Sequence, residues 1–208
     1  MKQGKLNIAT CHKDLAAFKK ILDGKNKNIG EERLLKFFKV RKNLLLLMGK
    51  MNIDSPRFYK EEFNIFNEFY ADFAIADRKK EKYLFVEFED AKRYSVFKGL
   101  KNSKTKKHDW SARFEHGFSQ IVDWFYRLDD YSKTNKFAQH FGTAKIEYTA
   151  ILVIGRAISM PPGSQSRLDW RMENVDIHKK KVICLTYDAL YQELVDKLDI
   201  VIDDSKIK

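Results

Sequence analysis

Two apolar segments in the second half of the chain constrain the fold most strongly. Residues 148–156 read YTAILVIGR and residues 181–186 read KVICLT, so each carries an almost unbroken apolar run rich in β-branched side chains. Strands of this composition are typically buried on both faces, as in a sheet that is covered by helices on both sides. We therefore expect an α/β fold.

The rest of the sequence predicts helices around an aromatic, β-rich segment. Residues 57–90 are rich in aromatic and β-branched side chains and predict two or three strands in a meander. Apolar residues at helical spacing predict helices over residues 14–23, 31–48, 110–130 and 187–198. We also expect a short helix or turn near residues 137–141, and a polar helical piece after Gly163 that contains Leu168, Trp170 and Met172. We expect an N-terminal helical segment and linker over residues 1–30 and one α/β domain over residues 31–208.

Composition narrows the class of partner. The 208 residues include 40 Lys and Arg against 29 Asp and Glu, a net charge of +11. This surplus favours a polyanionic partner, since clustered basic side chains neutralise phosphates and release counterions. Cys11 and Cys184 stand far apart without metal-ligand spacing, which argues against a zinc site and a disulfide framework. The longest apolar run, residues 44–48, is far short of the roughly 20 residues that span a bilayer, so we expect a cytoplasmic protein without a membrane partner.

Three carboxylates stand within an otherwise apolar hairpin, residues 70–89. A tight symmetric turn places Asp72 opposite Glu87, and the side-chain period of two puts Glu89 on the same face. Converging carboxylates are costly because like charges repel and each loses solvation. A divalent cation such as Mg²⁺ or Mn²⁺, which prefers oxygen ligands, would offset that cost. The alternative is a polar sheet edge on which Glu87 and Glu89 face solvent beside Arg or Lys.

The helix predicted over residues 110–130 carries a second polar feature. Arg113, His116, Gln120 and Trp124 recur every three to four residues, opposite a stripe of phenylalanines. Such a stripe can face a phosphate or a catalytic water. The alternative is that His116 and Gln120 are solvated or satisfy a buried polar contact.

The order of these features resembles the PD-(D/E)XK restriction-endonuclease-like superfamily. Members carry an Asp on one strand, Glu-x-(Lys or Glu) on the next, and a helix with a Gln. The resemblance implies an α/β restriction-endonuclease-like core of a helix, a three-stranded β-meander, a second helix and further strands. Four strings look like the nuclease domain of Shedu anti-phage defence proteins: VEFEDA at 86–91, HGFSQIVDW at 116–124, VIGR at 153–156 and LTYDAL at 185–190.

This resemblance implies a metal-dependent endonuclease of anti-phage defence that hydrolyses phosphodiester bonds of DNA, with RNA as the alternative, and that forms a homo-oligomer. It implies Asp72, Glu87 and Glu89 as ligands of Mg²⁺ or Mn²⁺, and as catalytic residues together with Gln120. Glu89 departs from the superfamily, which usually has a lysine there to stabilise developing charge. A glutamate can instead ligate a metal or accept a proton from water.

Further residues are implied with less detail. Either Glu31 or Glu32 matches an acid of the first helix that sometimes completes the metal shell. The nucleic-acid backbone would be guided, without regard to base sequence, by Arg93, Lys98, Arg113, His116 and the lysine cluster at residues 101–107.

A function from another class also fits: a nuclease-fold module that binds nucleic acid or a partner but lost activity with Glu89. Metal binding discriminates between the two. No nucleotide-binding GxxxxGK[ST] or GxGxxG string, serine-hydrolase GxSxG or zincin HExxH is present. Arg156, at a strand end, is a candidate phosphate contact. We expect Trp170, between Arg167 and Arg171, to pack rather than to stack on a base.

Overall fold

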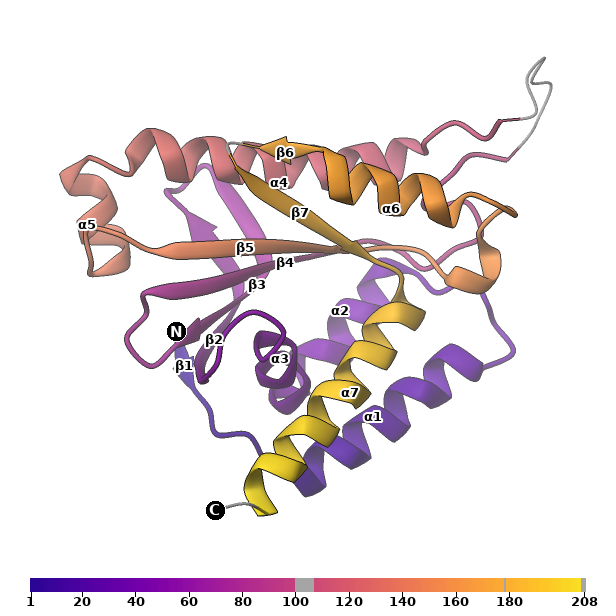
Figure 1. Ribbon diagram of the computed structural model, residues 1–208, viewed down its shortest axis with the longest axis horizontal. Helices are drawn as coiled ribbons and strands as arrows, with labels where there is room; N and C mark the ends of the chain where they lie inside the picture. Colours follow the sequence, from indigo (N-terminus) through magenta and orange to yellow (C-terminus); the bar gives the residue numbers. More distant parts are fainter. Residues whose placement is uncertain (100–106, 178, 207–208) are drawn as a thin grey trace.

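A computed structural model describes residues 1–99, 107–177 and 179–206. Within these residues one mixed sheet has the strand order β1-β2-β3-β4-β5-β7-β6 (Figure 1). The strands are β1 (Lys2–Gln3), β2 (Pro56–Ile65), β3 (Phe69–Asp77), β4 (Lys82–Phe88), β5 (Glu147–Val153), β6 (Asp176–Ile177) and β7 (Lys180–Leu185).

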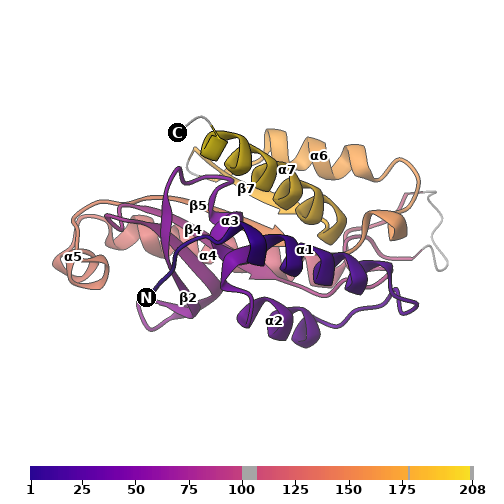
Figure 2. The same ribbon diagram turned by 90° about the horizontal axis from the view of Figure 1, so that it is seen from below.

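Helices cover the sheet on both faces, which makes a three-layer α/β fold (Figures 1 and 2). In the described residues they are α1 (Ile8–Asp23), α2 (Glu31–Lys39), α3 (Lys42–Gly49), α4 (Ala112–Tyr131), α5 (Asn135–Phe141), α6 (Gln165–Asn174) and α7 (Tyr187–Lys206). Helices α1, α2, α3 and α7 share a core with one sheet face, and α4, α5 and α6 share a second core with the other. None of the helices described is long and apolar enough to cross a membrane.

The meander predicted for residues 57–90 is confirmed, and it consists of three antiparallel strands, β2, β3 and β4. Between β3 and β4, Phe73 pairs with Val86 and Ala76 pairs with Tyr83. This is the register that the sequence predicts, and one step further along the same ladder brings Asp72 opposite Glu87.

The turn between β3 and β4 is tight although it contains no glycine. Asp77 accepts hydrogen bonds through Oδ1 from the backbone amides of Glu81, at 2.8 Å, and Lys82, at 3.0 Å. Lys80 takes a left-handed conformation with φ of 58°. An Asp side chain that binds the backbone thus closes the turn, while a lysine accepts the conformation that glycine usually supplies.

The two strands expected to be buried on both faces lie in the middle of the sheet. Strand β5 runs parallel to β4 on one side and to β7 on the other. The side chains of residues 150–154 are fully buried. The apolar run is therefore explained by helices on both faces of a parallel part of the sheet.

The prediction of one helix over residues 31–48 is wrong, because α2 ends at Lys39 and α3 begins at Lys42. At the break, Arg41 has φ of −119° and ψ of 64°, and its guanidinium stacks 3.8 Å from the Phe37 ring centre. Helix α2 buries one side only, whereas residues 43–49 of α3 are all buried. A break lets α3 enter the core while α2 stays at the surface.

Candidate functional site

The three carboxylates of the β3–β4 hairpin lie on one face of the sheet, near the end of β4. Asp72 accepts a hydrogen bond of 2.8 Å through Oδ2 from the backbone amide of Phe88. Glu87 is 7% exposed and Glu89 is 2% exposed. The alternative of a solvated sheet edge is therefore wrong, since the two glutamates are buried in a core that α4 covers.

Burial raises the pKa of all three carboxyl groups. For Asp72 and Glu87 desolvation is the largest cause, and neighbouring carboxylates raise the pKa values further. Desolvation also raises the pKa of Glu89 to about 7, although the charge of Arg113 opposes this rise. The protein thus disfavours the ionised form of these three carboxyl groups, and a cation would stabilise that form.

Arg113 of α4 supplies one such positive charge. Its Nη1 atom donates to Oε2 of Glu89 at 2.9 Å and to Oε2 of Glu31 at 3.0 Å. Glu32 points elsewhere, because its side chain is 82% exposed and pairs with Lys36. Of the two acids left open by the sequence, the structure therefore brings Glu31 to the site.

Helix α4 approaches the carboxylates closely because it carries a glycine at the contact. A Cβ atom at Gly117 would lie 2.7 Å from Cδ1 of Leu152 and 3.1 Å from Cγ of Glu89. Gln120 lies one turn further along the same helix face. Its Oε1 atom is buried without a hydrogen-bond donor among the described residues. The site thus has acceptors in excess of donors.

The predicted polar stripe of α4 is only partly correct. Arg113 is exposed but reaches Glu89 with its guanidinium, and Gln120 is half-buried, whereas His116 is exposed. Trp124 is fully buried in the core and stacks edge-on against Phe85. At roughly 100° per residue, the phenylalanine stripe and Trp124 together span about a third of the helix circumference, with Trp124 at the edge of this buried arc next to the polar stripe. Spacing alone therefore assigned Trp124 to the wrong side.

A basic pocket of about 570 Å³ opens beside the carboxylates. Arg113 lines it together with Lys92, Arg93 and Asp90, and Lys92 Nζ lies 2.9 Å from Oδ2 of Asp90. The Arg93 guanidinium lies 5.3 Å from the Tyr94 ring centre. Lys98 is exposed, and its backbone pairs with that of Asp109. Of the lysine cluster, Lys107 is exposed, and residues 100–106 lie outside the described part of the chain.

The first residue of α7, Tyr187, contacts the backbone just after the end of β4. Tyr187 is fully buried and donates a hydrogen bond of 2.6 Å from its hydroxyl to the backbone carbonyl of Glu89. The Tyr187 amide donates to the carbonyl of Gly155, at 3.0 Å. Three of the short strings noted in the sequence thus meet at one place, where they position the backbone of the carboxylate strand.

The prediction that Arg156 contacts phosphate is wrong. Its side chain is 3% exposed and makes two hydrogen bonds to Asp188, at 2.9 and 2.8 Å. A third bond, from Nη1, goes to the carbonyl of Leu22 at the end of α1. Arg156 therefore ties β5, α7 and α1 together. Its position at a strand end did not distinguish this role from a surface contact.

The donor atoms at the site are those that a hard divalent cation prefers. Asp72 and Glu87 offer carboxylate oxygens, and the orphaned Oε1 of Gln120 can accept a hydrogen bond from a water of hydration. Within residues 1–99, 107–177 and 179–206, no three acidic, histidine or cysteine side chains form a group that by itself holds a metal. Mg²⁺ usually retains several waters and needs only one or two carboxylates, so the Asp72–Glu87 pair fits this ion.

Comparison with known proteins identifies the family. A family described as "Shedu protein SduA, C-terminal" matches residues 28–191, which include the carboxylates, strands β2 to β7 and helices α2 to α6. No curated protein matches the sequence. The match confirms the resemblance to Shedu proteins and indicates a role in anti-phage defence. The chain therefore belongs to the family of the C-terminal domain of the Shedu protein SduA.

Proposed function

We propose that this chain is a metal-dependent nuclease with a restriction-endonuclease-like core, and that DNA is its substrate. The observation that carries the proposal is that the β3–β4 register brings Asp72, half-buried, opposite Glu87, buried, beside a pocket lined by basic side chains. Buried carboxylates are rare unless they are paired or hold a cation. Their position at the end of a central strand, next to a pocket lined by Lys92, Arg93 and Arg113, is consistent with hydrolysis of a nucleic-acid backbone.

The topology supports the proposed core. An antiparallel meander, β2 to β4, is followed by helix α4 and then by β5, which lies parallel to β4. This is the arrangement of helix, meander, helix and further strands that the superfamily resemblance implies. Helix α2, which carries Glu31, precedes the meander, as the first helix of that core would.

Each residue of the site has a role in the proposal. Asp72 and Glu87 would hold Mg²⁺ or Mn²⁺, which supplies Lewis-acid stabilisation of the charge that develops on the phosphate oxygens. Glu89, with a pKa raised to about 7, suits the acceptance of a proton from an attacking water near neutral pH. Gln120 would orient that water through its unpartnered Oε1 atom. Arg113 would hold Glu89 in place.

The basic pocket supplies the contact with the backbone of the nucleic acid. Lys92 and Arg93 lie on the loop that follows β4, and Arg113 faces them from α4. Contacts of this kind go to phosphate oxygens and are independent of base sequence. Binding should therefore weaken steeply as the salt concentration rises.

The decisive experiment measures cleavage of supercoiled, linear and single-stranded DNA with Mg²⁺, Mn²⁺ or EDTA. We expect metal-dependent cutting by the wild type and none by Asp72→Asn or Glu87→Gln. Glu81→Gln, an exposed acid in the turn of the same hairpin, is the matched control and should cut normally. Mn²⁺ binding measured by calorimetry should disappear with the same two substitutions. Cutting that survives Glu87→Gln would refute the assignment.

A second function is favoured by one observation. Glu89 is already neutralised by Arg113, so that the described residues offer two free carboxylates rather than three. A module that only binds nucleic acid is consistent with this arrangement. DNA that shifts in a gel but remains intact with every metal would establish binding without hydrolysis.

A further inference from the structure

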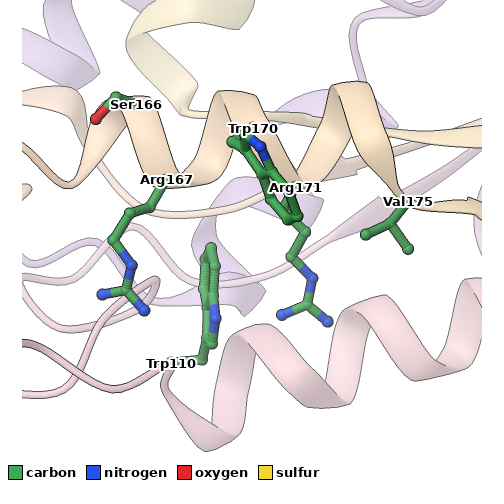
Figure 3. A pocket seen from close by; sticks show the side chains of 6 residues that line it. All are labelled: Trp110, Ser166, Arg167, Trp170, Arg171 and Val175. Carbon is green, nitrogen blue, oxygen red and sulfur yellow. The ribbon is translucent and has the colours of Figure 1, made fainter.

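A second pocket, of about 710 Å³, lies between α6 and the segment that leads into α4 (Figure 3). Its walls carry Trp170, Arg167 and Arg171 from α6, and Trp110 from the opposite side. Trp170 is 63% exposed, and none of the described residues stacks on its ring. The expectation that Trp170 packs against the protein is therefore wrong.

The opposite wall of this pocket is rigid. Trp110 stacks between Phe97 and Phe114, with ring centres 4.5 and 4.6 Å apart. Arg171 lies 4.8 Å from the Trp110 ring centre and is held by two hydrogen bonds to Glu115, at 2.8 and 3.0 Å. The stacked rings of Phe97, Trp110 and Phe114, with the ion-paired Arg171 over Trp110, thus lie across the pocket from the exposed Trp170 ring.

Arg167 provides a positive charge that is not neutralised. Its Nη1 atom donates to the backbone carbonyl of His108 and forms no ion pair with a carboxylate in the described chain. Its guanidinium lies 5.3 Å from the Trp110 ring centre, at the same pocket (Figure 3). A pocket with one uncovered aromatic ring and one guanidinium without a carboxylate partner among the described residues is complementary to a flat ring that carries an anion.

We propose that this pocket binds one nucleotide unit, with the base stacked on Trp170 and the phosphate held by Arg167. Bases of every kind stack on exposed aromatic rings, and a guanidinium forms forked hydrogen bonds to phosphate. The volume lies within the range of small-ligand sites. The net charge of +11 would attract the same ligand. The pocket does not include the carboxylates, and binding there requires no hydrolysis. The proposal therefore does not depend on whether the chain is a nuclease.

The base has two sources, a free nucleotide or an unpaired position in a nucleic-acid strand. Arg113 and Glu115 stand two positions apart in the first turn of α4. Arg113 donates a hydrogen bond to Glu89 at the carboxylate site, whereas Glu115 accepts one from Arg171 at the pocket. The carboxylates and the pocket therefore flank the same turn of α4. A strand that passes one site could place a neighbouring base in the other.

The test is a fluorescence titration of the full chain in EDTA. The chain has three tryptophans. Trp110 and Trp170 line the pocket, whereas Trp124 is fully buried in the core. A ligand that stacks on Trp170 therefore quenches the emission from the pocket and leaves that of Trp124 unchanged. We expect AMP and single-stranded hexanucleotides to quench, and ribose 5-phosphate to leave the emission unchanged. Trp170→Ala should weaken AMP binding about tenfold or more, measured by calorimetry. Arg167→Gln should weaken the binding of AMP but not that of adenosine.

Tyr126→Ala is the matched control, since Tyr126 is a similarly exposed aromatic residue on α4, and this variant should bind AMP normally. A hexanucleotide that binds much more tightly than AMP assigns the base to a strand, whereas equal affinity assigns a free nucleotide. The proposal is overturned if neither ligand quenches, if Trp170→Ala binds AMP as the wild type does, or if acrylamide cannot reach Trp170 because a second copy covers it. Should Trp170→Ala not fold, protection of the wild-type emission from acrylamide by AMP gives the same test.

Discussion

Arg113 Nη1 lies 2.9 Å from Oε2 of Glu89, and among the described residues it is the one basic side chain that hydrogen-bonds to any of Asp72, Glu87 and Glu89. The superfamily that this sequence resembles usually carries a lysine at the position of Glu89. Here the positive charge comes from the facing helix instead of from the strand. The arrangement leaves Glu89 buried without an unpaired charge.

The first prediction concerns this pair. Arg113→Ala should lower the free energy of unfolding by about 1–3 kcal/mol at pH 8, because it leaves an ionised carboxylate buried without a partner. The loss should be smaller at pH 5, where Glu89 is protonated. Urea unfolding at both pH values measures it, with Arg33→Ala, at an exposed position of α2, as the control. A loss independent of pH would show that the ion pair is not its cause.

The second prediction concerns pH. The pKa of Glu89 rises from its ordinary value of 4.5 to about 7 on folding, so that its contribution to stability is complete below pH 4.5 and is lost as the pH rises through 7. The raised pKa values of Asp72 and Glu87 act in the same direction. Glu87→Gln should therefore be more stable than the metal-free wild type at pH 8, and the difference should shrink toward pH 5. Thermal unfolding in EDTA measures the difference; Mn²⁺ should stabilise the wild type only.

The third prediction concerns the contact between α4 and the sheet. Alanine at position 117 favours the helix by about 1 kcal/mol over glycine, but its Cβ would press on Leu152 and Glu89. We expect Gly117→Ala to lose about 1–3 kcal/mol of stability through overpacking, and to lose cleavage activity. Ser119→Ala, at an exposed position of the same helix, should show neither loss. An unchanged or raised melting temperature for Gly117→Ala would contradict the close packing.

The fourth prediction concerns the buried ion pair of Arg156. Asp188→Ala should cost about 3–5 kcal/mol, because it leaves a buried guanidinium without its partner. Asp199→Ala, at an exposed position of the same helix, should be neutral in urea unfolding. Salt should change the cost only slightly, since the Arg156 side chain is 3% exposed although that of Asp188 is 26% exposed; a strong salt dependence would contradict the burial of the guanidinium.

The fifth prediction separates two adjacent acids. Glu31 reaches the site through Arg113, whereas Glu32 is exposed and pairs with Lys36. If the chain cleaves DNA, Glu31→Gln should reduce the rate and Glu32→Gln should not. Equal rates for the two variants would show that Glu31 does not act on the site.

Much of the fold can be read from the sequence because side-chain periodicity carries the information. The apolar run at residues 148–156 predicted a strand buried on both faces, and β5 lies at the centre of the sheet. The register of the β3–β4 hairpin followed from a tight symmetric turn, and the side-chain period of two then put Glu89 on the same face as Glu87. A slip of one residue would have turned every side chain of one strand to the other face. The neighbourhood of Asp72 and Glu87 was thereby predictable.

Other features were decided only by tertiary packing. Periodicity assigns a side chain to one side of a helix, but it does not say what lies on that side, and so Trp124 is buried while Trp170 is exposed. The break before α3 depends on the space that the core offers to residues 43–49.

Long charged side chains were the least predictable, because their partners come from segments distant in sequence. Arg113 reaches Glu31 and Glu89, and Arg156 reaches Asp188. The sequence by itself determined strands β2 to β5 and β7, the register of the β3–β4 hairpin and the clustering of acids at the end of β4, but not the two-residue strands β1 and β6. The tertiary structure alone decided which cation neutralises these acids, since an ion pair forms only where folding brings two remote side chains within about 3–4 Å.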